Sequence, residues 1–282
     1  MLRALLASLA IVVSNGALPV KVPKPKPASY QPAAQSQYLS SASYDTGAER
    51  ELFVMANQAR AQAGVSPLQL DEGLTQAARE HASAMAARQQ LSHQFSGEPS
   101  LALRLAASTN LHLNQAGENV ASAPSVEQAQ ESLMLSPPHR ENLLNPVYNV
   151  AGFAVIRSGN TLYVTQDFGQ GLATYSEKES EDRVAASVIR MRNDARLPPL
   201  QREGSGAARA SACAMAQADS LNTPAPQAHY VLRYTSMQLD ALPNGAAKVI
   251  GDRSVHSFAV GACYGRAPSY PNGVYWVALL FY

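Results

Sequence analysis

Two short polar stretches of the chain carry residue types that can do chemistry. In AGEN, Glu118 stands between Gly117 and Asn119, and in SPPHRENLLNP, His139 follows a Ser-Pro-Pro turn. A carboxylate and an imidazole can bind a divalent metal ion, transfer protons, or hold loops by hydrogen bonds. The two residues lack the close helical spacing of an HExxH motif. Metal or ligand binding, catalysis and a purely structural role therefore all stay open.

A catalytic role would need a nucleophile beside the histidine. Ser136 precedes His139 in the same turn and is the candidate in this stretch. A serine nucleophile is typically activated by a base that a third residue orients, and many hydrolases place it in a G-x-S-x-G elbow. Neither feature is recognisable here. No catalytic residue is assigned, and Ser136 remains an alternative nucleophile.

The composition is that of a folded protein without a strong charge. The chain has 282 residues, of which 46% are apolar, and a formal net charge of +1. This length allows one large or two ordinary domains, and the balanced charge does not favour a nucleic-acid partner.

The N-terminal region has the pattern of an export signal followed by a polar leader. Arg3 precedes an apolar run from Ala4 to Val13, and small residues follow at Ser14 and Gly16. The run is shorter than the roughly 20 residues of a membrane-spanning helix, so we expect cleavage after residue 16 and no transmembrane segment in the mature chain. Residues 17–45 are rich in proline, serine and glutamine, which predicts a disordered leader.

Helical periodicity then gives way to strand-like runs. Three helices are predicted, from Thr46 with Glu49 as its capping-box partner, from Asp71, and from Ser125 with Gln128 as its partner. The second helix should bury one face, made of Leu74, Ala77, Ala78, His81 and Met85. The runs VAGFAVIR and TLYVTQDF follow, joined by SGN, and predict an antiparallel hairpin. Helices followed by strands predict an α+β fold.

An ordered set of motifs resembles the CAP superfamily, also called the SCP domain. The set comprises NQAR, AREHASAMAARQQLSH, AGENV, SPPHRENLLNP and VAGFAV, and it runs from about Glu49 to Phe168. The superfamily includes cysteine-rich secretory proteins, antigen 5, pathogenesis-related proteins and exported bacterial relatives. The resemblance implies an α-β-α sandwich, here over residues 46–172, whose central cleft carries two histidines and one or two acidic residues.

Carried over residue by residue, the resemblance places His93, Glu118 and His139 in that cleft. Ser136 falls where other members have a second acid. Two imidazoles and one carboxylate are a suitable first shell for zinc or a similar divalent ion. His93, His139 and Glu118 are therefore the expected metal ligands, with Ser136 lining the same cleft, and a purely structural role for these residues is the alternative.

Residues 184–282 repeat the first domain in degenerate form. RNDAR, PLQREG and AARASACAMA echo NQAR, PLQLDEG and AAREHASAMA in the same order, and a final hairpin repeats as well. We expect two tandem α-β-α units joined by a polar linker at residues 173–183. The second unit should lack a paired-histidine site, because it has no equivalent of GEN or SPxHR.

Both cysteines, Cys213 and Cys263, lie in this second unit. An even pair in an exported protein predicts a disulfide, which here would close a loop of about fifty residues. Two buried free thiols are the alternative.

These observations predict a secreted or periplasmic binding module whose ligand is an unidentified envelope, lipid or protein component. Catalysis is not expected on balance. A metal-dependent hydrolase or peptidase is one alternative function. A sterol or lipid carrier is the other, because the resemblance implies that some relatives carry such ligands.

Overall fold

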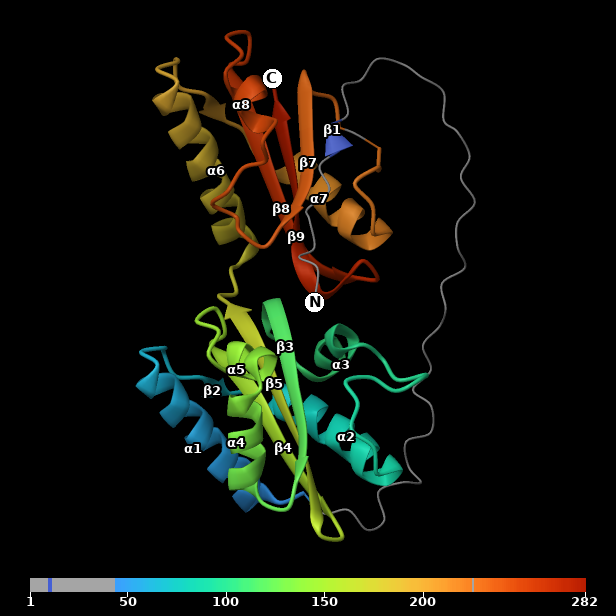
Figure 1. The fold of residues 1–282 in the computed structure, drawn as a ribbon. Helices are drawn as coiled ribbons and strands as arrows, with labels where there is room; N and C mark the ends of the chain where they lie inside the picture. Colours follow the sequence, from blue (N-terminus) through green and yellow to red (C-terminus); the bar gives the residue numbers. More distant parts are fainter. Residues whose placement is uncertain (1–9, 12–43, 225) are drawn as a thin grey trace. The chain divides into compact units, whose positions relative to one another are not determined.

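The chain folds into two compact units, each built around its own β-sheet (Figure 1). The structure is a computed structural model that describes residues 10–11, 44–224 and 226–282. Among these residues, the first unit contains 44–172, and the second contains 173–282 together with Ala10–Ile11. No helix of this part of the chain combines the length and apolar character needed to cross a membrane. Two tandem α+β units confirm the predicted fold class.

The first unit has helices on both faces of a four-stranded sheet. Its helices are α1 Thr46–Gln62, α2 Glu72–Arg88, α3 Leu101–Ser108, α4 Val126–Leu135 and α5 Pro137–Leu143, and its strands are β2 Gln69–Leu70, β3 His112–Ala123, β4 Val150–Ser158 and β5 Thr161–Leu172. The strand order is β2-β4-β5-β3, with β2 parallel to β4 and the other neighbours antiparallel. The helices α1, α4 and α5 pack on one face, and α2 and α3 on the other.

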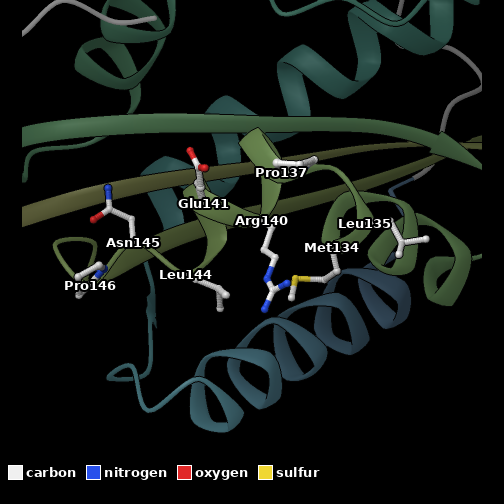
Figure 2. Close-up of a pocket in the computed structure, with 8 residues that line it drawn as sticks. All are labelled: Met134, Leu135, Pro137, Arg140, Glu141, Leu144, Asn145 and Pro146. Atoms are coloured by element: carbon white, nitrogen blue, oxygen red, sulfur yellow. The ribbon is translucent and has the colours of Figure 1, made fainter.

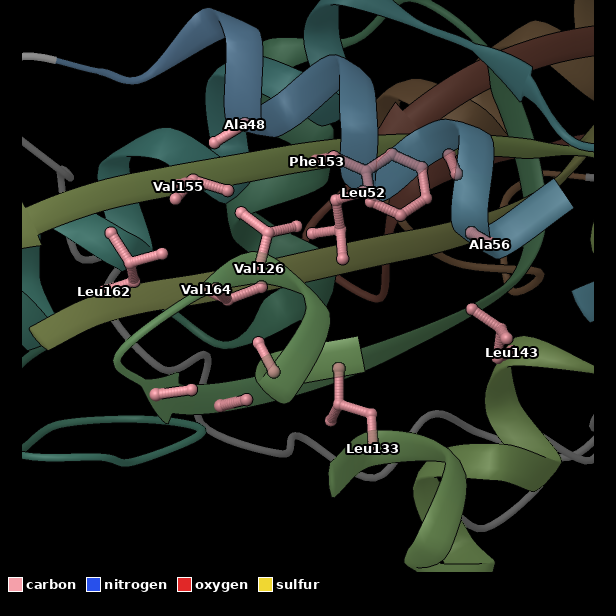
Figure 3. Packing of buried hydrophobic residues seen from close by; sticks show 14 of the residues in the cluster. Ala48, Leu52, Ala56, Val126, Leu133, Leu143, Phe153, Val155, Leu162 and Val164 are labelled. Atoms are coloured by element: carbon pink, nitrogen blue, oxygen red, sulfur yellow. The ribbon is translucent and has the colours of Figure 1, made fainter. Parts of the chain in front are cut away.

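The largest core of the first unit lies between the sheet and the helices α1 and α4 (Figure 3). Leu52 and Ala56 are one helical turn apart on α1 and meet Phe153 of β4. This spacing directs both side chains toward the sheet, which explains why the segment folds as an amphipathic helix. On the opposite face, the five residues predicted to be buried on α2 are all buried.

The second unit repeats this layered arrangement. It contains α6 Glu177–Asp194, β6 Gln201–Arg202, α7 Gly206–Ala218, β7 Tyr230–Ser236, α8 Ala246–Ile250, β8 Ser257–Ala267 and β9 Tyr270–Phe281. Its sheet has the order β1-β7-β9-β8-β6, where β1 is the two-residue strand Ala10–Ile11. The core between the sheet and α6 is separate from the one under α7.

Three pairs of contacts occupy corresponding places in the two units. The buried Arg60 donates to four backbone carbonyls, those of Ser66, Leu143, Asn145 and Tyr148. The buried Arg192 likewise donates to those of Pro198, Ile250, Asp252 and Val255. The bidentate ion pair of Arg79 with Glu49 recurs as that of Arg209 with Glu181.

The third pair of contacts concerns glycines where a helix lies directly on a strand. A Cβ on Gly152 would lie 2.1 Å from the backbone of Leu74 in α2, and a Cβ on Gly261 would lie 2.1 Å from the backbone of Ala208 in α7. Only glycine permits this approach. The shared devices show that the sequence repeat extends to the packing of each unit.

Two expectations about chain boundaries are wrong. The N-cap of α1 is Asp45, whose carboxylate accepts from the backbone N–H of Ala48, so Thr46 begins the helix instead of capping it. Residues 177–183 of the predicted linker are helical, because Ser176 and Glu179 form a capping box that starts α6. The predicted signal and leader, residues 1–45, fall outside the described residues except for 10–11 and 44–45.

Cys213 on α7 and Cys263 on β8 form a disulfide. The bond links the helix to the sheet within the second unit and confirms the predicted pairing.

Candidate functional site

The GEN segment lies on strand β3. Glu118 pairs across the antiparallel ladder with Asp167 of β5, and Asp167 pairs in turn with Gly152 of β4. Both acidic residues are buried. The sheet therefore fixes the carboxylate of Glu118 at the edge strand, beneath the segments that carry the two histidines.

His93 lies in the segment that follows α2. That helix ends at Gln89, whose backbone is left-handed at φ 49° and turns the chain back toward the sheet. The Nδ1 atom of His93 lies 2.9 Å from Oε1 of Glu118. The contact with Glu118 holds Nδ1 of His93 in place, while 58% of the side chain is exposed to solvent. The rest of the ring is therefore accessible to a ligand.

His139 lies in the first turn of α5. Pro137 occupies the start of this helix, where a missing N–H is tolerated, so the predicted Ser-Pro-Pro turn is a helix start. The Nδ1 atom of His139 lies 2.8 Å from Oγ of Ser136. The rings of His93 and His139 are stacked with centroids 6.2 Å apart and planes inclined by 29°.

Two asparagines hold α5 against β3. Asn119 donates to the backbone carbonyl of His139 at 2.9 Å, and Asn142 donates to the backbone carbonyl of Glu118 at 3.2 Å. Asn142 also donates to the side chain of Asn119. These bonds fix the height of His139 relative to Glu118.

A buried arginine neutralises the carboxylate. Arg104 of α3 is ion-paired with Oε2 of Glu118 and lies 3.3 Å from Glu98. His81, which is fully buried on α2, contacts Glu98 through Nδ1 at 2.6 Å and the carbonyl of Ser92 through Nε2 at 2.8 Å. His81 is thus a satisfied core histidine, as expected. Sequence reasoning missed Arg104, Glu98 and Asp167.

Burial dominates the electrostatics of the site. It raises the pKa of Asp167 well above its usual range, and the facing charge of Glu118 raises it further. The pKa of His139 is lowered, first by partial burial and then by the nearby His93. Asp167 is therefore a neutral acid beside a carboxylate, and His139 favours the neutral imidazole that can accept a proton or bind a metal.

The described residues contain no group of three or more His, Cys, Asp or Glu side chains arranged to hold a metal ion. His93, Glu118 and His139 do lie together, but both oxygens of Glu118 are engaged, by His93 and by Arg104. No described residue is hydrogen-bonded to Nε2 of His93 or His139. In this arrangement the Nε2 atoms of His93 and His139 could bind a metal ion, because oxygen atoms of Glu118 and Ser136 hold each Nδ1. Glu118 is not placed as a third ligand, because both of its oxygens already have partners.

A separate pocket of about 600 Å³ lies where α4 meets α5 (Figure 2). Its lining combines apolar residues with one arginine and one glutamate: Met134, Leu135, Pro137, Arg140, Glu141, Leu144, Asn145 and Pro146. None of the four cleft residues predicted from the sequence, His93, Glu118, Ser136 and His139, contributes to it.

The part of the chain that carries this site is similar to known proteins. Residues 54–168 match the CAP model, described as the cysteine-rich secretory protein family. The uncharacterized protein YkwD of Bacillus subtilis is 30% identical over 115 residues, which are 40% of this chain and 44% of that protein. The chain thus spans less than half the length of this curated relative.

Two solved structures are similar to the chain. One is an outer surface protein from Borrelia burgdorferi, with 20% identity, a TM-score of 0.43, and coverage of 47% of this chain and 100% of that chain. The other is an extracellular SCP-domain protein from Bacillus anthracis, with 25% identity, a TM-score of 0.41, and coverage of 44% and 41%.

Proposed function

We propose that the first unit, whose residues 54–168 match the CAP family model, is an exported binding module whose ligand meets His93 and His139. The observation that carries this proposal is the stacked pair of imidazoles. Each ring is fixed through Nδ1, so Nε2 is left for a ligand.

Each neighbouring group has a distinct part in this proposal. Glu118 and Ser136 set the orientation of the two rings, while the ion pair with Arg104 holds Glu118 in place. A zinc or similar divalent ion, when bound, would supply a Lewis-acidic centre with open positions for a protein or small-molecule donor. In this version of the site, Glu118 orients a ligand residue instead of coordinating the metal itself.

Calorimetric titration of the tag-free protein with Zn²⁺ tests the proposal. We expect about one ion per chain, with most of the affinity lost in both His93→Ala and His139→Ala. His229→Ala and His256→Ala are matched controls in the second unit and should bind as the wild type does. Absence of binding by the wild type, or unchanged binding in both cleft variants, would refute a metal-binding role.

The same proposal includes export from the cell. The disulfide is typical of oxidising compartments, and the apolar run from Ala4 to Val13 with small residues after it has the pattern of a cleaved signal. Cleavage after residue 16 would remove strand β1 from its place beside β7. N-terminal sequencing of the mature protein tests this point, with a start near Ala17 expected. Protein that retains Met1 would contradict the export of a processed chain.

The pocket at the α4–α5 junction supports a second candidate function, the transport or storage of an apolar ligand. Met134, Leu135 and Leu144 provide an apolar wall, and Arg140 provides a cation for a carboxylate head group (Figure 2). Mass spectrometry of organic extracts from the purified protein tests this candidate. A co-purifying lipid that Leu144→Asp eliminates would support it, and its retention in that variant would exclude the pocket as its site.

A hydrolytic role has less support. Ser136 and His139 lie at the distance expected of a nucleophile and its base. No carboxylate among the described residues is hydrogen-bonded to the other nitrogen of His139, so the arrangement lacks the group that orients a catalytic base.

A further inference from the structure

The second unit places a buried arginine where the first places the glutamate of its cleft. In the first unit, Gly152, Asp167 and Glu118 stand opposite one another across β4, β5 and β3. In the second, Gly261, Ala278 and Arg233 stand opposite one another across β8, β9 and β7. Since Gly152 and Gly261 each pack on the same kind of helix, the two rows correspond. The charge at this position is therefore reversed.

Arg233 is only 5% exposed, yet the nitrogens that carry three of its five N–H donors, Nε and Nη2, have no partner among the described residues. Its Nη1 donates to the backbone carbonyls of Leu221 and Thr223, at 3.2 and 2.6 Å. Its Nε and Nη2 atoms are buried without a partner among the described residues. No carboxylate there is ion-paired with Arg233, whereas the buried Arg104 of the first unit has two. Burial lowers the pKa of Arg233, because water is withdrawn and no carboxylate replaces it.

Two other arginines of this chain show what that edge can bind. Arg79 directs Nε and Nη2 at the two oxygens of Glu49, at 2.9 and 2.5 Å. Arg209 does the same with Glu181, at 2.7 and 2.8 Å. This parallel fork is the preferred way for a guanidinium to bind a carboxylate or a phosphate. The Nε and Nη2 edge of Arg233 is the same fork without its anion.

A second buried donor lies on the same face of the sheet. Trp276 pairs with Thr235, two residues from Arg233, and so stands diagonal to the arginine across β7 and β9. The indole Nε1 of Trp276 is buried and has no hydrogen-bond partner in the described part of the chain. An indole N–H can only donate, as can a guanidinium. An unpaired guanidinium edge in the interior is costly, and an acceptor with negative charge would satisfy it. The Nε1 edge of the indole lies against Gly265 of β8, on the side away from β7, so Trp276 is a nearby reporter of Arg233 and not a second ligand group.

We propose that the Nε and Nη2 edge of Arg233 binds an oxyanion, the carboxylate or phosphate group of a ligand. The second unit is then a binding unit in its own right, with a ligand of opposite charge to the metal proposed for the first. Its site is independent of His93 and His139.

Nuclear magnetic resonance tests the site in the exported protein, which begins near Ala17. Trp276 is the single tryptophan of the chain, so its indole resonance needs no assignment. Inorganic phosphate and sodium acetate are titrated separately, at ionic strength held constant with chloride. A saturable shift of the indole and of the Nε–H of Arg233 is expected with at least one anion, and the stronger of the two responses identifies the group. No saturable shift with either anion overturns the proposal.

Three variants provide the control. Arg233→Met removes the charge and should abolish the shift of the indole, whereas Arg233→Lys keeps the charge without the fork and should weaken binding at least about tenfold. Arg253→Met removes an exposed arginine of the same unit and should bind as the wild type does. Binding that persists in Arg233→Met overturns the proposal. If Arg233→Met does not fold, the proposal is judged from the wild-type protein alone. The Nε–H resonance of Arg233 must then show a saturable shift with phosphate or acetate.

Discussion

Glu118 and Asp167 stand directly opposite each other on β3 and β5, and both carboxyl groups are buried. Two like charges at this separation in a protein interior do not both ionise, and Arg104 pairs with Glu118 rather than with Asp167. The proton therefore belongs to Asp167. Because Asp167 is neutral, it does not repel the carboxylate of Glu118, which keeps its contacts with His93 and Arg104.

Replacing Asp167 by asparagine tests this distribution of charge. The raised pKa means that the folded protein retains a proton that the unfolded chain releases near the usual aspartate pKa of 3.8. Stability should therefore fall as the pH rises above that value, until the folded pKa is passed. Asp167→Asn mimics the neutral acid and should flatten the dependence of the free energy of unfolding on pH, measured by urea melts. A variant with the same pH slope as the wild type would show that Asp167 is ionised in the fold.

The paired arginines Arg60 and Arg192 predict a matched pair of stability defects. Each is buried and satisfies four backbone carbonyls, which lose their partner in Arg60→Met or Arg192→Met. We expect a loss of about 3 to 5 kcal/mol in the unit concerned, measured by denaturant unfolding, because several buried acceptors are left unpaired.

The two variants should differ in their effect on the histidine site. Arg60 contacts the carbonyls of Leu143 and Asn145, at the end of the helix that carries His139. Arg60→Met should therefore weaken zinc binding as well, while Arg192→Met should leave it unchanged. Equal zinc affinity in both would indicate that α5 does not depend on this anchor.

The sequence predicted the elements whose pattern is local. The face of α2 formed by Leu74, Ala77 and Met85 follows helical periodicity, and the hairpin of β4 and β5 follows from two strand-like runs around a short turn. In both cases, the residues that decide the structure lie within one or two turns of each other.

The support of the site could not be predicted in the same way. The helix α3 is only eight residues long, and its arginine at 104 is buried only because Glu98 and Glu118 come from other segments. The polar run that contains Glu118 shows no strand alternation, and only pairing with β5 makes it a strand. These features depend on contacts between distant parts of the chain, which a single sequence does not show.

Removing the disulfide should destabilise the second unit alone. The bond joins residues 50 positions apart, and the chain-entropy model gives about 4 kcal/mol for a loop of this size. Cys213→Ala combined with Cys263→Ala should lower the unfolding midpoint of the second unit, measured by denaturant melts, and should leave zinc binding by the first unit intact. Thiol labelling of the native, unreduced protein should detect no free cysteine. Labelling of both residues would show that the bond does not form in solution.

The role assigned to Glu118 makes a quantitative prediction. If its carboxylate orients His93 through Nδ1, Glu118→Gln should reduce zinc affinity about 10- to 100-fold, as loss of such a supporting bond does at other metal sites. His93→Ala removes the ligand itself and should have the larger effect in the same titration. An effect of Glu118→Gln equal to that of His93→Ala would identify Glu118 as a direct ligand.

The titration of His139 in the metal-free protein tests whether the two imidazoles face each other. Burial and the neighbouring His93 lower its pKa below the usual histidine value of 6.5, so the unfolded chain takes up a proton at a higher pH than the folded one does. Stability should accordingly decrease as the pH falls below about 6.5, and zinc binding should weaken over the same range. In His93→Ala, the charge of the second ring is gone but the burial remains, so the pKa of His139 should rise toward 6.5 without reaching it. Proton and nitrogen resonances of the ring measure this directly. A His139 that titrates identically with and without His93 would mean that the rings are not stacked in solution, and the shared ligand proposed for them would lose its geometric basis.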